Sequence, residues 1–180
     1  MLVAVFGLSC LISRFFVTDA FGYSSFWPPN AAMLVALLSL RPRMAALVLV
    51  ACLALNFEIN SFADGLSPTE SFLACALNVV QVLVAAPMTR RFCGATIDLT
   101  RPRRFAAFTI IALLSAAIEA AIGVATEYML LGDATPPVRE WMQWVLCDAL
   151  GLLLATPAVL ALLRYARPGQ VVWLSLIHIC

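Results

Sequence analysis

The 180-residue sequence contains one histidine, His178, and all eleven of its basic residues are arginines. A single histidine near the end of the chain leaves no His-based catalytic triad and no histidine zinc site to propose. None of the six cysteines forms a CxxC pair, and no two lie within seventeen positions of each other. We therefore interpret the cysteines as small core residues, and expect no metal, no cofactor and no catalytic residue.

Charged residues are also scarce, at 12% of the chain, whereas 63% of the residues are apolar and the mean hydropathy is +0.99. A soluble domain has about 25% charged and about 45–50% apolar residues. Because so few polar residues cannot cover a surface that faces water, the composition predicts an integral membrane protein whose main partner is the lipid bilayer. The net charge of +1 provides no basic field and excludes a nucleic-acid-binding function.

Apolar runs separated by charged or turn residues predict an all-α fold, a polytopic membrane helix bundle with about six transmembrane helices. The runs are Leu2–Val17, Pro28–Leu40, Met44–Phe62, Ser71–Met88, Phe105–Leu131 and Val138–Leu163. A spanning helix needs about 20 residues, and the thirteen residues of the second run are too few. We expect the extended stretch Gly22–Trp27 to dip inward and complete that crossing.

The arginines predict the orientation of the bundle. Nine of them fall in loops on one predicted face, namely Arg41, Arg43, Arg90, Arg91, Arg101, Arg103, Arg104, Arg164 and Arg167. The opposite loops carry mainly carboxylates, so the positive-inside rule places the arginine-bearing loops and both termini in the cytoplasm. Three tryptophans near the other boundary, Trp27, Trp141 and Trp144, are expected to act as interfacial anchors. A cleaved signal peptide is the alternative for the first run, but Arg14 lies in a poor cleavage site.

Polar side chains inside the runs gather in the predicted outer half of the membrane. Such groups are costly in lipid and usually pair with one another or face a wet cavity. The candidate site residues are Asp148, Arg14, Glu119, Glu58 and Asn78, with Trp27 and Asn30 at the rim. One interpretation is structural: Arg14 pairs with Asp148 or Glu119 and holds the bundle together. The other is an outward-facing cavity for a small ligand, beside a short second helix whose amino end would favour anions.

Helical spacing sharpens this pattern in the fifth run. Four residues recur at intervals of four and form one polar stripe, namely Ser115, Glu119, Gly123 and Glu127. A neighbouring row of small residues, Ala117, Ala121 and Ala125, predicts the face that packs closely against another helix.

Two motifs resemble a known family. The first is WPPNAA at residues 27–32, followed by an apolar helix and RPR at residues 41–43. The second is WMQWVLCDALGLLLATP at residues 141–157, with Trp144, Asp148, Gly151 and Pro157 at the family's pattern positions. Together they resemble the first type of membrane-associated sensor domain (MASE), the integral-membrane input module of bacterial diguanylate cyclases and histidine kinases. Weaker similarity extends over most of residues 6–165.

The resemblance implies a sensory input domain in the inner membrane of a bacterium, with an unknown small ligand. It would pass its signal to a cytoplasmic output domain and form a homodimer through the full-length protein. The chain has no nucleotide-binding motif, no GGDEF-like signature and no phosphoacceptor histidine, so we expect no enzymatic activity. Residues 1–167 are expected to form the sensor domain, incomplete at its carboxyl end, and residues 168–180 to be the start of a further span or a non-native tail.

Two other functions stay open as alternatives. A small transporter, or the substrate-binding membrane component of one, would also use several spans and a broken helix. Transport needs polar residues that continue into the cytoplasmic half, and that half of the predicted spans is almost wholly apolar. An intramembrane enzyme would need a histidine, a Ser/Lys pair or paired aspartates on adjacent spans, and none of these lies within the predicted spans.

Overall fold

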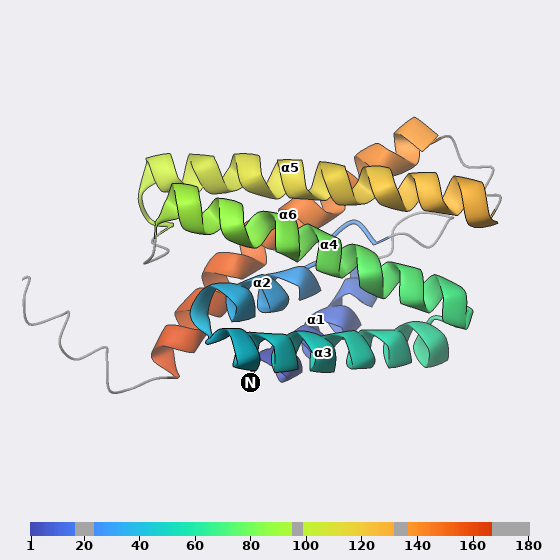
Figure 1. The fold of residues 1–180 in the computed structure, drawn as a ribbon, viewed down its shortest axis with the longest axis horizontal. Helices are drawn as coiled ribbons and strands as arrows, with labels where there is room; N and C mark the ends of the chain where they lie inside the picture. Colours follow the sequence, from blue (N-terminus) through green and yellow to red (C-terminus); the bar gives the residue numbers. More distant parts are fainter. Residues whose placement is uncertain (17–23, 95–98, 132–136, 167–180) are drawn as a thin grey trace, which may run out of the picture.

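The computed structural model describes residues 1–16, 24–94, 99–131 and 137–166, and within these ranges the chain is a bundle of six α-helices without a β-strand (Figure 1). The helices are α1 (Leu2–Ser13), α2 (Pro29–Ser39), α3 (Pro42–Glu58), α4 (Pro68–Cys93), α5 (Pro102–Thr126) and α6 (Pro137–Tyr165). A 3-10 turn (Arg14–Phe16) continues α1, and π turns (Ile59–Ala63 and Glu127–Leu131) continue α3 and α5. The predicted all-α fold is confirmed, and each predicted run overlaps one helix, although α3, α4, α5 and α6 begin before the predicted runs do.

Proline sets where most of these helices begin. In the described part of the chain, five of the six helices start at a proline, namely Pro29, Pro42, Pro68, Pro102 and Pro137. The first residue of a helix has no intrahelical partner for its N–H, so proline loses nothing there and its fixed φ suits the helix. The start of α4 also has a capping box, in which the Ser67 backbone N–H donates to the Glu70 carboxylate and the Ser67 hydroxyl accepts from the Glu70 N–H.

Four of the described segments are long and apolar enough to cross a membrane: Pro42–Ala63, Pro68–Cys93, Pro102–Met129 and Pro137–Tyr165. The segment Leu2–Phe16 and helix α2 are shorter. The eleven residues of α2 span roughly 16 Å, about half of a hydrocarbon core about 30 Å thick. The predicted shortness of this second helix is therefore confirmed, while the number of six spans stays a prediction.

Helix α2 lies at the centre of the bundle. It packs against α1, α3, α4 and α6, and every residue from Pro29 to Ala36 is buried. A helix that is covered on all sides has no need of an amphipathic pattern, and the small side chains of Ala31, Ala32 and Ala36 let its neighbours approach closely. The core therefore forms around α2, with the longer helices outside it.

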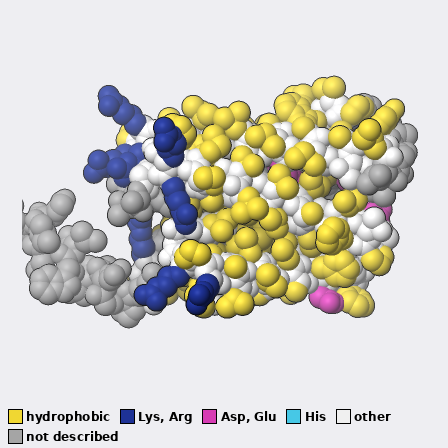
Figure 2. Space-filling view, viewed as in Figure 1, with side chains coloured by type: hydrophobic (Ala, Val, Ile, Leu, Met, Phe, Trp, Pro, Cys, Tyr) yellow, Lys and Arg dark blue, Asp and Glu magenta, His cyan; other side chains and the backbone are white. Residues whose placement is uncertain are grey.

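Most of the arginine side chains gather at one end of the molecule (Figure 2), and Arg14 and Arg139 belong to other segments. The segments that carry the gathered side chains are the starts of α3 and α5 and the ends of α4 and α6. The predicted grouping of these segments is therefore confirmed for eight of the nine arginines, since Arg167 lies outside the described residues. Which side of a membrane this end faces stays a prediction, as do both expectations for residues 168–180, which also lie outside the described residues.

The packing face of α5 differs from the predicted one. Ala121 and Ala125 are exposed, and the buried small residues are instead Ala112, Ala116 and Ala120. The predicted polar stripe does face inward, since Ser115, Glu119 and Gly123 are buried. Of the predicted face only Ala117 is half-buried, and its carbonyl oxygen accepts from the Trp141 Nε1–H of α6. The interpretation of the cysteines is confirmed for the described ones, all of which are buried and free: Cys10, Cys52, Cys75, Cys93 and Cys147.

Candidate functional site

The two sequence motifs meet in space, where the extended segment before α2 lies directly on α6. The Trp27 backbone N–H donates to the Cys147 carbonyl oxygen at 3.4 Å. A Cβ atom placed on Gly151 would lie 2.0 Å from the Trp27 carbonyl oxygen and 3.0 Å from the Pro28 nitrogen. Only glycine leaves room for so close a backbone approach. The segment before α2 thus packs against α6, while the expected inward dip of Gly22–Trp27 into the membrane stays a prediction, and Gly22 and Tyr23 lie outside the described residues.

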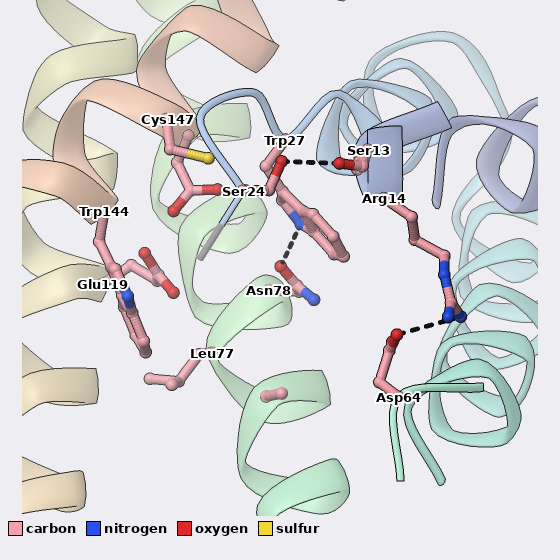
Figure 3. Close-up of a pocket in the computed structure, with 12 residues that line it drawn as sticks. Ser13, Arg14, Ser24, Trp27, Asp64, Leu77, Asn78, Glu119, Trp144 and Cys147 are labelled. Atoms are coloured by element: carbon pink, nitrogen blue, oxygen red, sulfur yellow. Dashed lines mark hydrogen bonds and ion pairs between the residues drawn. The ribbon is translucent and has the colours of Figure 1, made fainter. Parts of the chain in front are cut away.

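A cavity of about 220 Å³ opens beside this contact (Figure 3). Its walls come from the end of α1, the 24–27 segment, the turn after α3, and helices α4, α5 and α6. The lining residues are Ser13, Arg14, Ser24, Trp27, Asp64, Ala74, Leu77, Asn78, Glu119, Trp144, Cys147 and Asp148. The structure therefore brings together five of the seven candidate residues, namely Arg14, Trp27, Asn78, Glu119 and Asp148.

The other two candidates lie elsewhere. Glu58 is exposed on α3 and does not line the cavity, so its assignment to the polar centre is not supported. Asn30 is fully buried in the first turn of α2 rather than at the rim, and its side-chain amide donates to Gln81 Oε1. Residues of the cavity that the sequence reasoning missed include Asp64, Trp144 and Cys147. For Trp144 and Asp148 a signal existed, since a spacing of four places them on the same face of a helix.

Glu119 and Asp148 form the acidic inner wall of the cavity. They come from neighbouring helices, α5 and α6, and their side chains are 4% and 7% exposed. Both side chains line the cavity. The Oε2 atom of Glu119 is buried and accepts no hydrogen bond from any described residue. The wall therefore holds two neighbouring acids, one of which has a buried oxygen atom without a partner among the described residues.

Arg14 does not pair with either of these acids, so the structural interpretation in which it neutralises Asp148 or Glu119 is wrong. Its guanidinium lies 3.0 Å from the Asp64 carboxylate and donates to the Ala63 carbonyl oxygen at 2.8 Å. The 3-10 turn after α1 directs this long side chain across to the turn that follows α3. Both partners are about two-fifths exposed, and such a pair contributes about 1 kcal/mol or less.

Two indole rings complete the walls. The Trp27 Nε1–H donates to Asn78 Oδ1 at 3.0 Å. This bond attaches the indole ring to α4. The Trp144 ring rests on Gly123 of α5, where an added Cβ would lie 2.1 Å from Cζ3. Trp141 lies outside the cavity and donates to the Ala117 carbonyl oxygen at 3.1 Å. Of the three expected interfacial anchors, Trp27 and Trp144 are thus cavity residues.

A second polar contact lies in the core next to the site. Asn30 and Gln81 are both fully buried and bonded to each other, yet Asn30 Oδ1 and Gln81 Nε2 have no hydrogen-bond partner among the described residues. Replacing one amide leaves the other with no partner, which costs about 1–3 kcal/mol, whereas replacing both by apolar groups of similar shape can be nearly neutral.

We therefore expect Gln81→Leu alone to lower the free energy of unfolding by about 2 kcal/mol, and the double variant Asn30→Leu/Gln81→Leu to lower it by less. Denaturant titration of the purified protein in detergent measures both. A double variant that is less stable than the single variant would contradict this account of the pair.

The comparisons with known proteins give one match. Residues 1–171 match the MASE1 family, a range that contains both motifs and all the residues that line the cavity. A search of curated proteins and a search of solved structures each found no match.

Proposed function

Because the chain belongs to the MASE1 family of membrane sensory input domains, we propose that it senses a small ligand in the cavity and passes the signal to a cytoplasmic output domain. The observation that carries the proposal is the contact between the two motifs, in which Trp27 and Pro28 lie on Gly151 of α6 beside the cavity. A ligand in the cavity touches the 24–27 segment and α6 together. A change at this point therefore acts directly on the last described helix, which ends among the arginines.

The proposed setting is the inner membrane of a bacterium, with the arginine-rich end and both termini in the cytoplasm. The positive-inside rule supports this orientation. In the proposed arrangement the chain itself performs no catalysis. The output domain follows α6 and is a diguanylate cyclase or a histidine kinase, brought into a homodimer in the full-length protein. An in-frame cyclase or kinase domain downstream in the gene would support this assignment, and an unrelated soluble enzyme would contradict it.

The transporter alternative has less support. A transport path has to continue from the cavity to the arginine-rich end. Helix α2 runs between those two places, and its residues 31–36 are apolar and fully buried. This central helix would have to leave the core before any polar substrate could pass.

The proposal can be tested by joining the chain to a diguanylate cyclase domain and measuring cyclic di-GMP formation in membranes. We expect Asp148→Asn to change the output at least about tenfold, since the loss of one charged contact of about 1.5–3 kcal/mol shifts a two-state equilibrium by that factor. Glu58→Gln is the matched control, because it neutralises an exposed carboxylate outside the cavity. Equal output from both variants at normal membrane levels would refute the proposal.

A further inference from the structure

The charge balance of the cavity indicates what kind of ligand it accepts. Arg14 is the only basic residue among the described residues that line it, and Arg14 is already paired with Asp64 at the exposed edge. Glu119 and Asp148 on the inner wall therefore have no basic side chain opposite them in that lining. An anion placed there would meet two acids, whereas a cation would balance them.

The hydrogen-bonding state of the acids leads to the same ligand class. Glu119 is nearly fully buried, and its Oε2 atom accepts no hydrogen bond from any described residue. A buried acceptor without a partner costs about 1–3 kcal/mol, and more when it is charged. A carboxylate oxygen only accepts, so the group that satisfies it has to donate a hydrogen bond or carry a positive charge.

The aromatic walls also suit a cation. Tryptophan is the best of the aromatic side chains at attracting a cation to its ring face. The Trp27 N–H is used in its bond to Asn78, so the π face of that ring is what it can offer to a ligand. The Trp144 ring is held in place by its contact with Gly123 of α5. The Trp27 and Trp144 rings thus line the same cavity as the two acids, an arrangement that suits a partly desolvated cation.

The volume of the cavity and the side chains available to hold a metal ion narrow the class of ligand further. The cavity, at about 220 Å³, is smaller than the roughly 300–1,000 Å³ of sites for drug-sized molecules. The described residues contain no group of three or more His, Cys, Asp or Glu side chains placed to hold a metal ion. The expected preference for an anion depended on the amino end of α2, and no residue of α2 is in the lining.

We propose that the cavity binds a small organic cation of the ammonium class, held by the Glu119 and Asp148 carboxyl groups and by the Trp27 and Trp144 rings. This inference rests on the proposed function, because it names the chemistry of the ligand that the sensor detects. An ammonium group can come from a soluble amine or from the headgroup of a membrane lipid, and both present the same charge to the site.

The first experiment titrates the purified full chain in detergent with choline and with ethanolamine, and follows tryptophan fluorescence and the thermal midpoint. The control is 3,3-dimethyl-1-butanol, which has the shape of choline without its charge. We expect at least one of the two ammonium compounds to bind saturably and to raise the midpoint, and the neutral analogue to do neither. The inference is overturned if neither ammonium compound binds more tightly than the neutral analogue.

The second experiment locates the binding. In Glu119→Gln/Asp148→Asn the ammonium affinity should fall about 10- to 100-fold, as expected for the loss of a hydrogen bond to a charged group. Trp144→Phe keeps a ring and should weaken binding about 2- to 10-fold. Glu58→Gln should bind like the unmodified protein. Unchanged affinity in both cavity variants, with an unchanged circular dichroism spectrum, would also overturn the inference.

The third experiment distinguishes the two sources of the ammonium group and separates the two proposals. Choline affinity is compared in nanodiscs of phosphatidylglycerol and of phosphatidylethanolamine: a lower affinity in the latter identifies the lipid headgroup as the occupant, and equal affinity identifies a soluble amine. If choline fails to bind while Asp148→Asn still changes the cyclase output, only the cation inference fails. If choline binds without any effect on that output, the sensor function fails instead.

Discussion

Replacing Gly151 by alanine is expected to lower the free energy of unfolding by about 3 kcal/mol, the upper end of the usual cost of overpacking. The added Cβ would lie 2.0 Å from the Trp27 carbonyl oxygen and 2.4 Å from its carbonyl carbon. These are backbone atoms, so no side-chain rotation can relieve the overlap. The whole segment before α2 has to move away from α6, and the Trp27 N–H then loses its bond to Cys147.

Gly7→Ala is the matched control for this substitution. Gly7 also lies in a helix, but its added Cβ would meet the Leu55 side chain, with Cδ2 at 2.7 Å. The tip of a leucine can rotate, and alanine favours the helix over glycine by about 1 kcal/mol. The free energy of unfolding should therefore change by less than about 1 kcal/mol.

Thermal and denaturant unfolding in detergent measure both variants, and acrylamide quenching compared between each variant and its Trp27→Phe counterpart reports whether Trp27 has left the cavity. If Gly151→Ala and Gly7→Ala change the midpoint by the same amount, the contact between the two motifs does not hold the segment in place.

The helices were predictable because their signals are local. An apolar run bounded by charged residues predicts a buried helix wherever it lies, and a proline at the first position marks its start. The shortness of α2 was predictable from the thirteen-residue length of its apolar run alone. The packing face of α5 could not be predicted in the same way, because Ala116 and Ala121 lie on opposite flanks of one polar stripe. Only the positions of α4 and α6 decide which flank is covered.

For the residues of the candidate site, position around the helix axis predicted burial better than expected depth in the membrane did. Asn56, Glu58 and Asn60 lie at similar depths, and depth placed Glu58 in the polar centre. Asn56 and Asn60 are buried, whereas Glu58 is exposed. A residue two positions from a buried one points about 200° away from it on a helix, so the spacing alone already placed Glu58 on the outer side.

The partner of Arg14 could not be predicted from either signal. Asp64 follows a π turn after α3, and fifty positions separate the two residues in the chain. Their contact depends on the direction of the chain after the 3-10 turn and after the π turn. The packing of α1 against α3 sets these two directions. A long, flexible arginine side chain can reach several carboxylates from one backbone position, so charge alone does not select among them.

The second large effect concerns the other glycine of the site. In Gly123→Ala the added Cβ would lie 2.1 Å from Trp144 Cζ3 and 2.9 Å from Cε3, so the ring has to leave its place on α5. We expect the free energy of unfolding to fall by about 2 kcal/mol. Trp144→Leu alone should lower it by about 2 kcal/mol, because a large, half-buried side chain is replaced by a smaller one.

The two changes should not add. Without the indole, the alanine at position 123 meets no ring, so the double variant Gly123→Ala/Trp144→Leu should be about 1–3 kcal/mol more stable than the sum of the single effects. The matched control combines Gly123→Ala with Phe62→Leu, which replaces an aromatic ring that is 85% exposed in the π turn after α3. That pair should be additive within about 0.5 kcal/mol.

Additive effects in the Gly123/Trp144 pair would mean that the ring does not rest on Gly123. A ring displaced from Gly123 also leaves its position in the cavity wall, so ammonium binding should weaken in Gly123→Ala by about as much as in Trp144→Phe. Because Gly123 does not line the cavity, a loss of binding in this variant comes from displaced wall residues and not from a lost ligand contact at position 123. This variant therefore tests the geometry of the aromatic wall without altering any group that touches the ligand.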